Sequence, residues 1–237
     1  MTAPLLTLDQ VHVHYGKSHI LRGVSFSVRE GEVVSLLGRN GSGRSTTMKA
    51  IMGLVSPSAG EVRLHGQQLA GLRPHAICRN GVGYVPEERE VFHNLTVEEN
   101  LRMGEQHPVA GATRWSIDQM FEWFPRLKER CNTPAGSLSG GEQQMLTICR
   151  SLLGNPLVLL VDEPTEGLAP KIVTAVAESI LDMQRRGVAV VLVEQKLAIA
   201  LKVSTRVCVM GHGQIVFQGT PQQLAQDRQL QADWLAV

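Results

Sequence analysis

The chain has 237 residues, of which 43% are hydrophobic, so it can bury a sizeable core. Its 23 basic and 22 acidic residues give a net charge of +1, which argues against a strongly basic nucleic-acid-binding protein and an acidic disordered chain. The 23 glycines and 11 prolines form no repeat, which excludes collagen-like and low-complexity classes. This length predicts one large domain, or one domain with a small lobe.

Cysteine usage and hydropathy favour a soluble protein of a reducing compartment. The four cysteines lie far apart without a C-x-x-C pair, so we expect neither a disulfide framework nor a zinc site. The first nine residues lack the basic and then apolar pattern of a secretory signal. Apolar runs reach about six residues, whereas a membrane-spanning helix needs roughly 20. The chain can still dock onto a membrane protein.

The first third of the chain reads as strands followed by a glycine-rich loop. We expect strands at Leu5 to Tyr15 and Ile20 to Val28, and a buried strand at Glu32 to Leu37. The loop from Gly38 to Gly43 follows at once, and a helix over Ser45 to Met52 comes next. Strand, glycine loop and helix in this order form the context in which a phosphate-binding loop is credible.

The middle of the chain, about 88–156, reads as helical. Thr96 and Glu99 have the spacing of a capping box, with Thr96 as N-cap. Apolar residues recur at helical spacing, and Trp115 and Trp123 make the same stretch rich in aromatics. The residues at that spacing are Ile117, Met120, Phe121, Phe124 and Leu127. They predict a helical core, part of whose surface can also receive a partner.

The last third alternates strands and helices. The expected elements are buried strands at Leu157 to Val161 and Val188 to Val193, a crossover helix at Pro170 to Arg186, strands at Arg206 to Met210 and Gln214 to Gln218 joined by a turn at 210–213, and a helical tail at Pro221 to Val237. The short aliphatic runs are typical of a parallel sheet buried on both faces. The order predicts an α/β fold with a helical insert.

The glycine loop fits the pattern G-x-x-x-x-G-K-[ST] at every fixed position except one. Its residues are Gly38, Arg39, Asn40, Gly41, Ser42, Gly43, Arg44 and Ser45. In such a loop the glycines let backbone N–H groups cradle phosphate oxygens, the following helix adds its positive end, and the hydroxyl of Ser45 ligates Mg²⁺. In isolation, a glycine turn that joins a strand to a helix also explains these residues.

Two further segments carry chemistry. Asp162 and Glu163 end a buried strand, where Asp162 could hold Mg²⁺ and Glu163 could activate a water. Ser139 with the amides of Gly140 and Gly141 could form a second anion-binding nest at a helix start. Taken alone, Asp162 and Glu163 can also be two solvated acids of a loop. The segment at Ser139, taken alone, can also be a flexible loop that caps a helix. All three elements in this order are not expected by chance.

With these motifs the sequence resembles the ATP-binding subunits of ATP-binding cassette (ABC) transporters over essentially its whole length. Leu138 to Gln144 matches the signature motif of that family. Segments typical of branched-chain amino acid importers are 83–87, 95–101, 124–127, 162–170 and 192–195, and urea-importer subunits share 164–167. The resemblance implies one P-loop NTPase cassette over 1–237. Its parts are a RecA-like core with a mixed sheet, an antiparallel β subdomain and a helical subdomain at about 88–156.

The resemblance also implies residue roles. ATP would contact the phosphate loop, Thr46 and Tyr15, whose ring would stack on adenine, while Ser139, Gly140, Gly141 and Glu142 would contact a nucleotide from the signature side. Glu163 would be the catalytic carboxylate. Glu87 would touch Mg²⁺ or the lytic water and contact the transporter, and Gln195 would hold the switch position after a core strand. Ser45, Glu87 and Asp162 would ligate Mg²⁺.

Arg44 departs from the family pattern, which has lysine there. A guanidinium is longer, planar and forked, so it must displace the phosphates or swing out of the loop. Because a misplacement of about 1 Å can cost on the order of 100-fold in rate, we expect ATP binding to persist and hydrolysis at this site to be slow. The alternative is that the loop accommodates arginine with modest loss.

Two functions follow from the resemblance. The first is an ATPase subunit of an importer on the cytoplasmic face of the inner membrane, paired with a second ATPase subunit as a homodimer or heterodimer. It would act on membrane permease subunits and, indirectly, on a periplasmic solute-binding protein. The second is a nucleotide-binding regulatory half-site with slow or no hydrolysis. A cassette of DNA repair does not fit, because only about 95 residues separate Gly43 from Ser139, and the near-neutral charge gives no footprint for nucleic acid.

Overall fold

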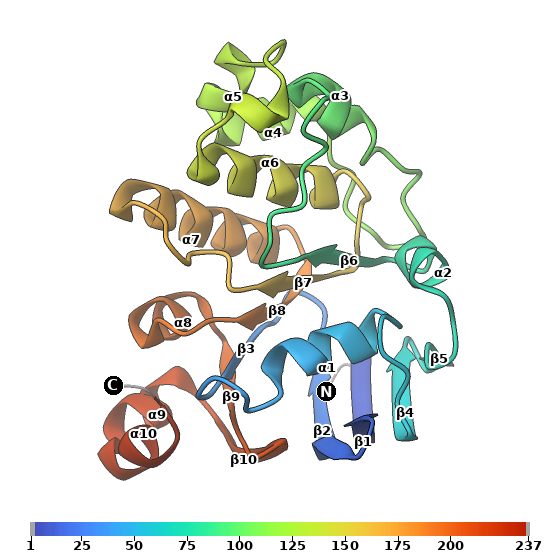
Figure 1. Ribbon diagram of the computed structural model, residues 1–237, viewed down its shortest axis with the longest axis vertical. Coiled ribbons are helices and arrows are strands. Elements are labelled where there is room, and N and C mark those ends of the chain that lie inside the picture. Colours follow the sequence, from blue (N-terminus) through green and yellow to red (C-terminus); the bar gives the residue numbers. More distant parts are fainter. Residues whose placement is uncertain (1–2, 236–237) are drawn as a thin grey trace.

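The computed structural model describes residues 3–235, which build two sheets with helices around them (Figure 1). The larger sheet has the strand order β10-β9-β3-β8-β7-β6. Its strands are β10 (Gln214–Gly219), β9 (Arg206–Gly211), β3 (Val33–Leu37), β8 (Ala189–Val193), β7 (Val158–Asp162) and β6 (Val82–Val85). All neighbours pair in parallel except β9 and β10, so this sheet is mixed, as expected.

The smaller sheet is antiparallel and has the order β2-β1-β4-β5. Its strands are β2 (Ser18–Val28), β1 (Leu6–Tyr15), β4 (Ala59–Leu64) and β5 (Gln67–Gln68). Along β1 the apolar side chains Val11 and Val13 are buried while His12 and His14 turn outward, which is the alternation of a sheet covered on one face. One buried cluster joins this face to the helix α1 (Arg44–Ile51) and the larger sheet.

Four α-helices lie between β6 and β7 in the sequence, with a short 3₁₀-helix at Ala135–Ser137 before the last of them. They are α3 (Val97–Arg102), α4 (Ile117–Trp123), α5 (Pro125–Glu129) and α6 (Gly140–Leu152). Figure 1 shows α3, α4 and α5 on the side of α6 that faces away from the larger sheet. Met120, Phe124 and Leu127 are buried in one cluster with Leu146 of α6, so the predicted helical face is core. We propose that these helices form the helical subdomain at about 88–156.

The remaining helices cover the larger sheet. They are α2 (Pro74–Arg79), α7 (Pro170–Arg185), α8 (Leu197–Val203), α9 (Pro221–Gln226) and α10 (Arg228–Trp234). Within residues 3–235, no helix combines the length and the apolar character that crossing a membrane requires.

Several expectations for the elements need correction. The apolar spacing from Ile117 to Leu127 spans two helices, because Phe124 leaves helical geometry (φ −129°, ψ 75°) before Pro125, which has no N–H to donate. Helices fill only parts of 88–156, and 104–115 contains none. The helical tail is broken at Asp227, and its last two residues lie outside the described part of the chain. The hairpin turn is shorter than expected, because β9 continues through Gly211.

Candidate functional site

The phosphate loop lies between β3 and α1 at the carboxyl edge of the larger sheet. Gly38 has φ +150°, and a Cβ there would approach the carbonyl oxygen of Met210 to 2.4 Å, so only glycine fits. Around Gly41, by contrast, a Cβ would meet nothing within 4 Å. The loop is thus closed toward the sheet and open on the side where a ligand would approach.

Helix α1 starts without a side-chain cap. Gly43, its N-cap, has φ +104° and offers no oxygen to the first-turn N–H groups. These groups therefore need an acceptor from water or a ligand, and the helix dipole favours an anion there. The hydroxyl of Thr47 donates to the Gly43 carbonyl at 2.9 Å and fixes the first turn. The arrangement fits a phosphate group.

Arg44 is buried, with 5% of its side chain exposed, and its guanidinium reaches across the site. Nη2 lies 3.1 Å from Oε1 of Glu163 and donates to Oδ1 of Asn40 at 3.2 Å. Nη1 donates to the carbonyl of Glu194 at 3.3 Å. The side chain thus extends past the phosphate loop to the carboxylate of Glu163, a contact that the sequence pattern did not predict.

Asp162 and Ser45 meet at the end of β7, as the motifs predict. The hydroxyl of Ser45 donates to Oδ1 of Asp162 at 3.2 Å, and the hydroxyl of Tyr84 lies 3.5 Å from Oδ2. Burial raises the pKa of Asp162 to about 6, although the bond from Ser45 opposes this. A hydroxyl and a carboxylate, both hard oxygen donors, are the ligands that Mg²⁺ prefers, so this pair fits the ion.

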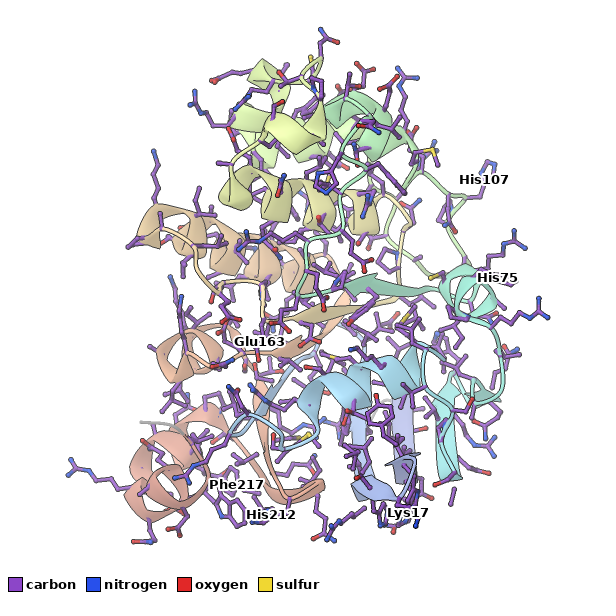
Figure 2. All side chains as sticks on the ribbon, in the orientation of Figure 1. Lys17, His75, His107, Glu163, His212 and Phe217 are labelled. Atoms are coloured by element: carbon purple, nitrogen blue, oxygen red, sulfur yellow. The ribbon has the colours of Figure 1, made fainter. Side chains whose placement is uncertain are left out.

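Glu163 follows Asp162 and lies near the centre of the molecule, where β7 ends (Figure 2). Its φ of +45° is rare for a residue with a Cβ and occurs often at functional sites. Its N–H donates to the carbonyl of Val193 at 2.9 Å, and Nε2 of Gln195 donates to Oε2 at 2.5 Å. Burial raises the pKa of Glu163, while Arg44 and Gln195 lower it.

Three carboxylates converge at this edge. One oxygen each from Glu87, Glu163 and Glu166 lies within 4.8 Å of the others. Glu87 is thus brought to the site as expected. Glu166 was not among the predicted residues, although it lies in a segment typical of the family, only three residues after Glu163.

The segment from Glu87 to Phe92 is held by several contacts. Arg89 donates from Nη2 to the carbonyl of Glu166 at 3.1 Å, and its own carbonyl accepts the hydroxyl of Thr147. Arg150 donates to the carbonyl of Glu90 at 2.6 Å and lies 4.7 Å from the ring centroid of Phe92. The segment therefore joins the acidic edge to α6. Sequence reasoning missed Arg89, whose long side chain makes its contact far along the chain.

The start of α6 carries the predicted signature residues. Ser139 is the N-cap, and its hydroxyl accepts the N–H of Glu142 at 3.3 Å. Oε2 of Glu142 accepts the N–H and the hydroxyl of Ser139, both at 2.8 Å. The polar groups of Ser139 thus form a capping box, and only the amides of Gly140 and Gly141 remain as first-turn donors.

For three other residues that were expected to contact the nucleotide, the structure gives the position and surroundings of the side chain. Tyr15, 47% exposed, ends β1 beside a hairpin turn, so its ring is free to stack; contact with adenine stays a prediction. Arg39 turns away from the sheet edge and donates to the carbonyl of Ala232 in α10 at 2.9 Å. Thr46 is half-buried in the first turn of α1.

Together, the fold and this edge define a nucleotide-binding α/β protein of the phosphate-loop class, in which a glycine loop, a helix start and two carboxylates meet. The sequence model of the family described as ABC transporter matches residues 21–166. The chain belongs to the ABC transporter family of ATP-binding domains.

The named relatives include a protein of the expected subfamily and a protein of an export system. The chain is 44% identical, over 91% of its length and 93% of the relative, to the high-affinity branched-chain amino acid transport ATP-binding protein BraG of Pseudomonas aeruginosa. It is 32% identical, over 98% of its length and 97% of the relative, to the lipopolysaccharide export system ATP-binding protein LptB of Haemophilus influenzae. The crystal structure of a nucleotide-free ATP-binding cassette from an ABC transporter matches with a TM-score of 0.82 and 25% identity, over 96% of this chain and 97% of that one.

Proposed function

We propose that this chain binds and hydrolyses ATP and thereby drives the import of branched-chain amino acids or related small solutes through separate membrane subunits. The observation that best supports hydrolysis is the hydrogen bond from Gln195 to Glu163 beside the phosphate loop. The direction and the solute class are supported by the likeness to BraG, whereas the likeness to LptB would favour export. The proposed location is the cytoplasmic face of the inner membrane.

The residues at the site have distinct tasks. The loop amides from Gly38 to Ser45 bind the phosphates, and the guanidinium of Arg44 supplies positive charge. Glu163 accepts a proton from the attacking water, and Gln195, bonded to the other carboxylate oxygen, keeps Glu163 pointed at that water. Tyr15 stacks on the adenine. Because Glu163 is buried, its proton affinity is high enough for a general base.

The donor set at the end of β7 fits a magnesium ion. Ser45 and Asp162 would hold it, with Glu87 as a further oxygen ligand. Bound Mg²⁺ would offset the negative charge of the phosphates as the terminal phosphate leaves.

We further propose that two cassettes act together. The start of α6, with Ser139, Gly140, Gly141 and Glu142, would complete the nucleotide site of a second ATPase subunit, identical or sibling. The amides of Gly140 and Gly141 are the first-turn donors that could reach a phosphate there.

A groove of about 270 Å³ near α6 is the proposed docking site for a membrane permease subunit. It is lined by Tyr84, Phe92, Met103, Arg150 and Pro156, among others. Phe92 and Met103 are large apolar side chains that are 48% and 63% exposed. An exposed apolar groove next to the acidic edge suits a protein partner that responds to nucleotide. A solute-binding protein would act through that permease.

The ion pair between Arg44 and Glu163 supports a second candidate, a regulatory half-site that binds nucleotide and hydrolyses it slowly. The guanidinium that should face the phosphates is engaged by the carboxylate that should face the water. ATP must break this pair before either group can work, which raises the cost of reaching the reactive arrangement.

Steady-state ATP hydrolysis by the purified chain, with and without its membrane subunits, distinguishes the two candidates. ATP binding is measured separately for the unaltered chain, Arg44→Lys and Glu163→Gln. Turnover in the unaltered chain that Glu163→Gln abolishes supports the ATPase. A rise of about tenfold or more in Arg44→Lys, at similar ATP affinity, supports the half-site. Absence of both binding and turnover in all three proteins contradicts both proposals.

A further inference from the structure

Glu194 directly follows β8 and was not predicted as a site residue, although it comes after a buried apolar run and precedes Gln195. It is 2% exposed, and both of its carboxylate oxygens are engaged. Oε1 accepts the backbone N–H groups of Gln195 at 2.9 Å and Lys196 at 3.0 Å, and Oε2 accepts the hydroxyl of Thr165 at 2.7 Å. Within residues 3–235 it has no ion-pair partner. Such a buried charge is tolerated only because three donors satisfy it.

These bonds join two loops that leave neighbouring strands. Thr165, which is fully buried, lies in the loop after β7, and Gln195 lies in the loop after β8. Parallel strands bring both loops to the same edge. Nζ of Lys196 donates to the carbonyl of Thr165 at 2.9 Å, which ties the loops a second time. The carbonyl of Glu194 itself accepts a bond from Arg44.

Gln195 needs such support because its side chain is exposed and yet must keep one orientation toward Glu163. Its Nε2 lies 2.5 Å from Oε2 of Glu163, a contact between the two joined loops. An exposed glutamine has several rotatable bonds, so this contact persists only if the backbone at Gln195 is fixed relative to Glu163. The carboxylate of Glu194 holds that backbone, and the hydroxyl of Thr165 in turn holds the carboxylate.

We propose that Glu194 is a positioning residue that holds the amide of Gln195 against Glu163 by clamping the loop after β8 to Thr165. Glu194 acts through Gln195. The role rests on the proposed hydrolysis at Glu163. Because a displacement of about 1 Å at a reacting group can cost on the order of 100-fold in rate, the clamp matters for turnover more than for binding.

The kinetic test uses Thr165→Val, which removes one hydroxyl without changing side-chain shape. It is made in the unaltered chain, the Arg44→Lys chain and the Gln195→Ala chain. We expect kcat to fall about tenfold with a KM for ATP within about twofold, and the fall to disappear when Gln195 is already alanine. An equal fall in the Gln195→Ala chain, or a KM that rises in step with the loss, overturns the proposal.

Substitutions at Glu194 separate hydrogen bonding from charge. Glutamine keeps a carbonyl for the two N–H groups and offers an amide to the Thr165 hydroxyl, so Glu194→Gln should keep most of the kcat that Glu194→Ala loses. Glu32→Gln is the control, since Glu32 is a buried carboxylate paired with Arg206 before β3, away from the site. We expect it to lower stability and leave kcat within about twofold of the unaltered chain. A Glu194→Gln variant as inactive as Glu194→Ala contradicts clamping by hydrogen bonds.

Hydrogen exchange of the nucleotide-free chain tests the clamp without hydrolysis. The amides of Gln195 and Lys196 should exchange about tenfold faster in Glu194→Ala than in the unaltered chain, while Glu194→Gln keeps their protection. Amides of β3 serve as an internal reference. Unchanged exchange in Glu194→Ala overturns the proposal whatever the kinetics show. Normal clamping in a chain that never hydrolyses ATP, even as Arg44→Lys, would instead overturn the proposed function.

Discussion

Arg44 and Glu163 form a buried ion pair across the nucleotide site, with Nη2 3.1 Å from Oε1 and side chains that are 5% and 7% exposed. The cation of the phosphate loop and the carboxylate next to Asp162 thus neutralise each other. A charge buried to this degree needs a partner, so replacing either residue leaves the other buried without a counter-charge.

Removing the cation should destabilise the fold. In Arg44→Met, the carboxylate of Glu163 stays buried without its partner, which we expect to lower the free energy of unfolding by about 3–5 kcal/mol. Adding Glu163→Gln to the same chain should recover part of this loss. Urea unfolding of the nucleotide-free variants measures both effects. Arg63→Met is the control, since it breaks an exposed pair with Glu61 and should cost less than about 1 kcal/mol.

The rate of ATP hydrolysis should decline as the pH falls, and the decline should begin at a higher pH than it would for a glutamate with an ordinary pKa. Burial raises the pKa of Glu163, and only the ionised carboxylate can accept a proton, so activity is lost as the pH drops through that raised value. Gln195 lowers the pKa of Glu163, so Gln195→Ala should move the acid limb of the kcat profile to still higher pH. A limb that stays in place, or moves to lower pH, contradicts this assignment.

The carboxylate of Glu142 should stabilise the start of α6 only above acidic pH. Burial raises the pKa of Glu142, but its bonds with Ser139 and the charge of Arg130 outweigh this and leave it below the usual 4.5. Because the folded pKa is depressed, the stabilisation is present above pH 4.5 and is lost as the pH falls through the folded value. Glutamine at this position keeps a capping box, as Gln119 does in α4, so Glu142→Gln removes only the charge. It should therefore cost roughly 0.5 kcal/mol near pH 7 and less as the pH falls below 4.5, measured by urea unfolding. Glu129→Gln, an exposed site, is the control.

The groove near α6 gives a prediction for assembly. Phe92→Asp places a charge on an exposed apolar side chain and should abolish co-purification with the permease subunits, while ATP affinity stays within about twofold of the unaltered chain. Leu54→Asp is a matched control, because Leu54 is 52% exposed and does not line the groove. Equal loss of the complex in both variants would show that the groove is not the docking surface.

The motifs near one another in the sequence were predicted well. The strand and helix around the phosphate loop and the capping box of Thr96 with Glu99 follow from local patterns, and the structure confirms them. The contact of Ser45 with Asp162 joins distant segments and was expected only because both motifs point to one Mg²⁺ site. Glycines and capping residues act on their own neighbours, so their signal is local.

The contacts that join distant segments were not predictable in this way. The pair of Arg44 with Glu163 and the bond of Glu194 with Thr165 depend on which strands become neighbours in the sheet. Strand β6 was missed because Val82 to Val85 is short, and the break at Pro125 was missed because apolar spacing continues across it. Tertiary packing decides whether such a segment forms a strand or ends a helix, and the spacing of apolar residues does not contain that information.

The stretch from Glu87 to Phe92 also limits how site and groove can act on each other. A fully extended chain advances at most about 3.6 Å per residue, so five steps span roughly 18 Å or less. Glu87 stands in the acidic cluster and Phe92 lines the groove. Arg89 is bound to the carbonyl of Glu166, and the carbonyl of Glu90 is bound to Arg150, so the stretch is anchored at two points between its ends. A displacement of Glu87 that passes along the backbone to Phe92 must therefore carry Arg89 and Glu90 with it or break one of these bonds.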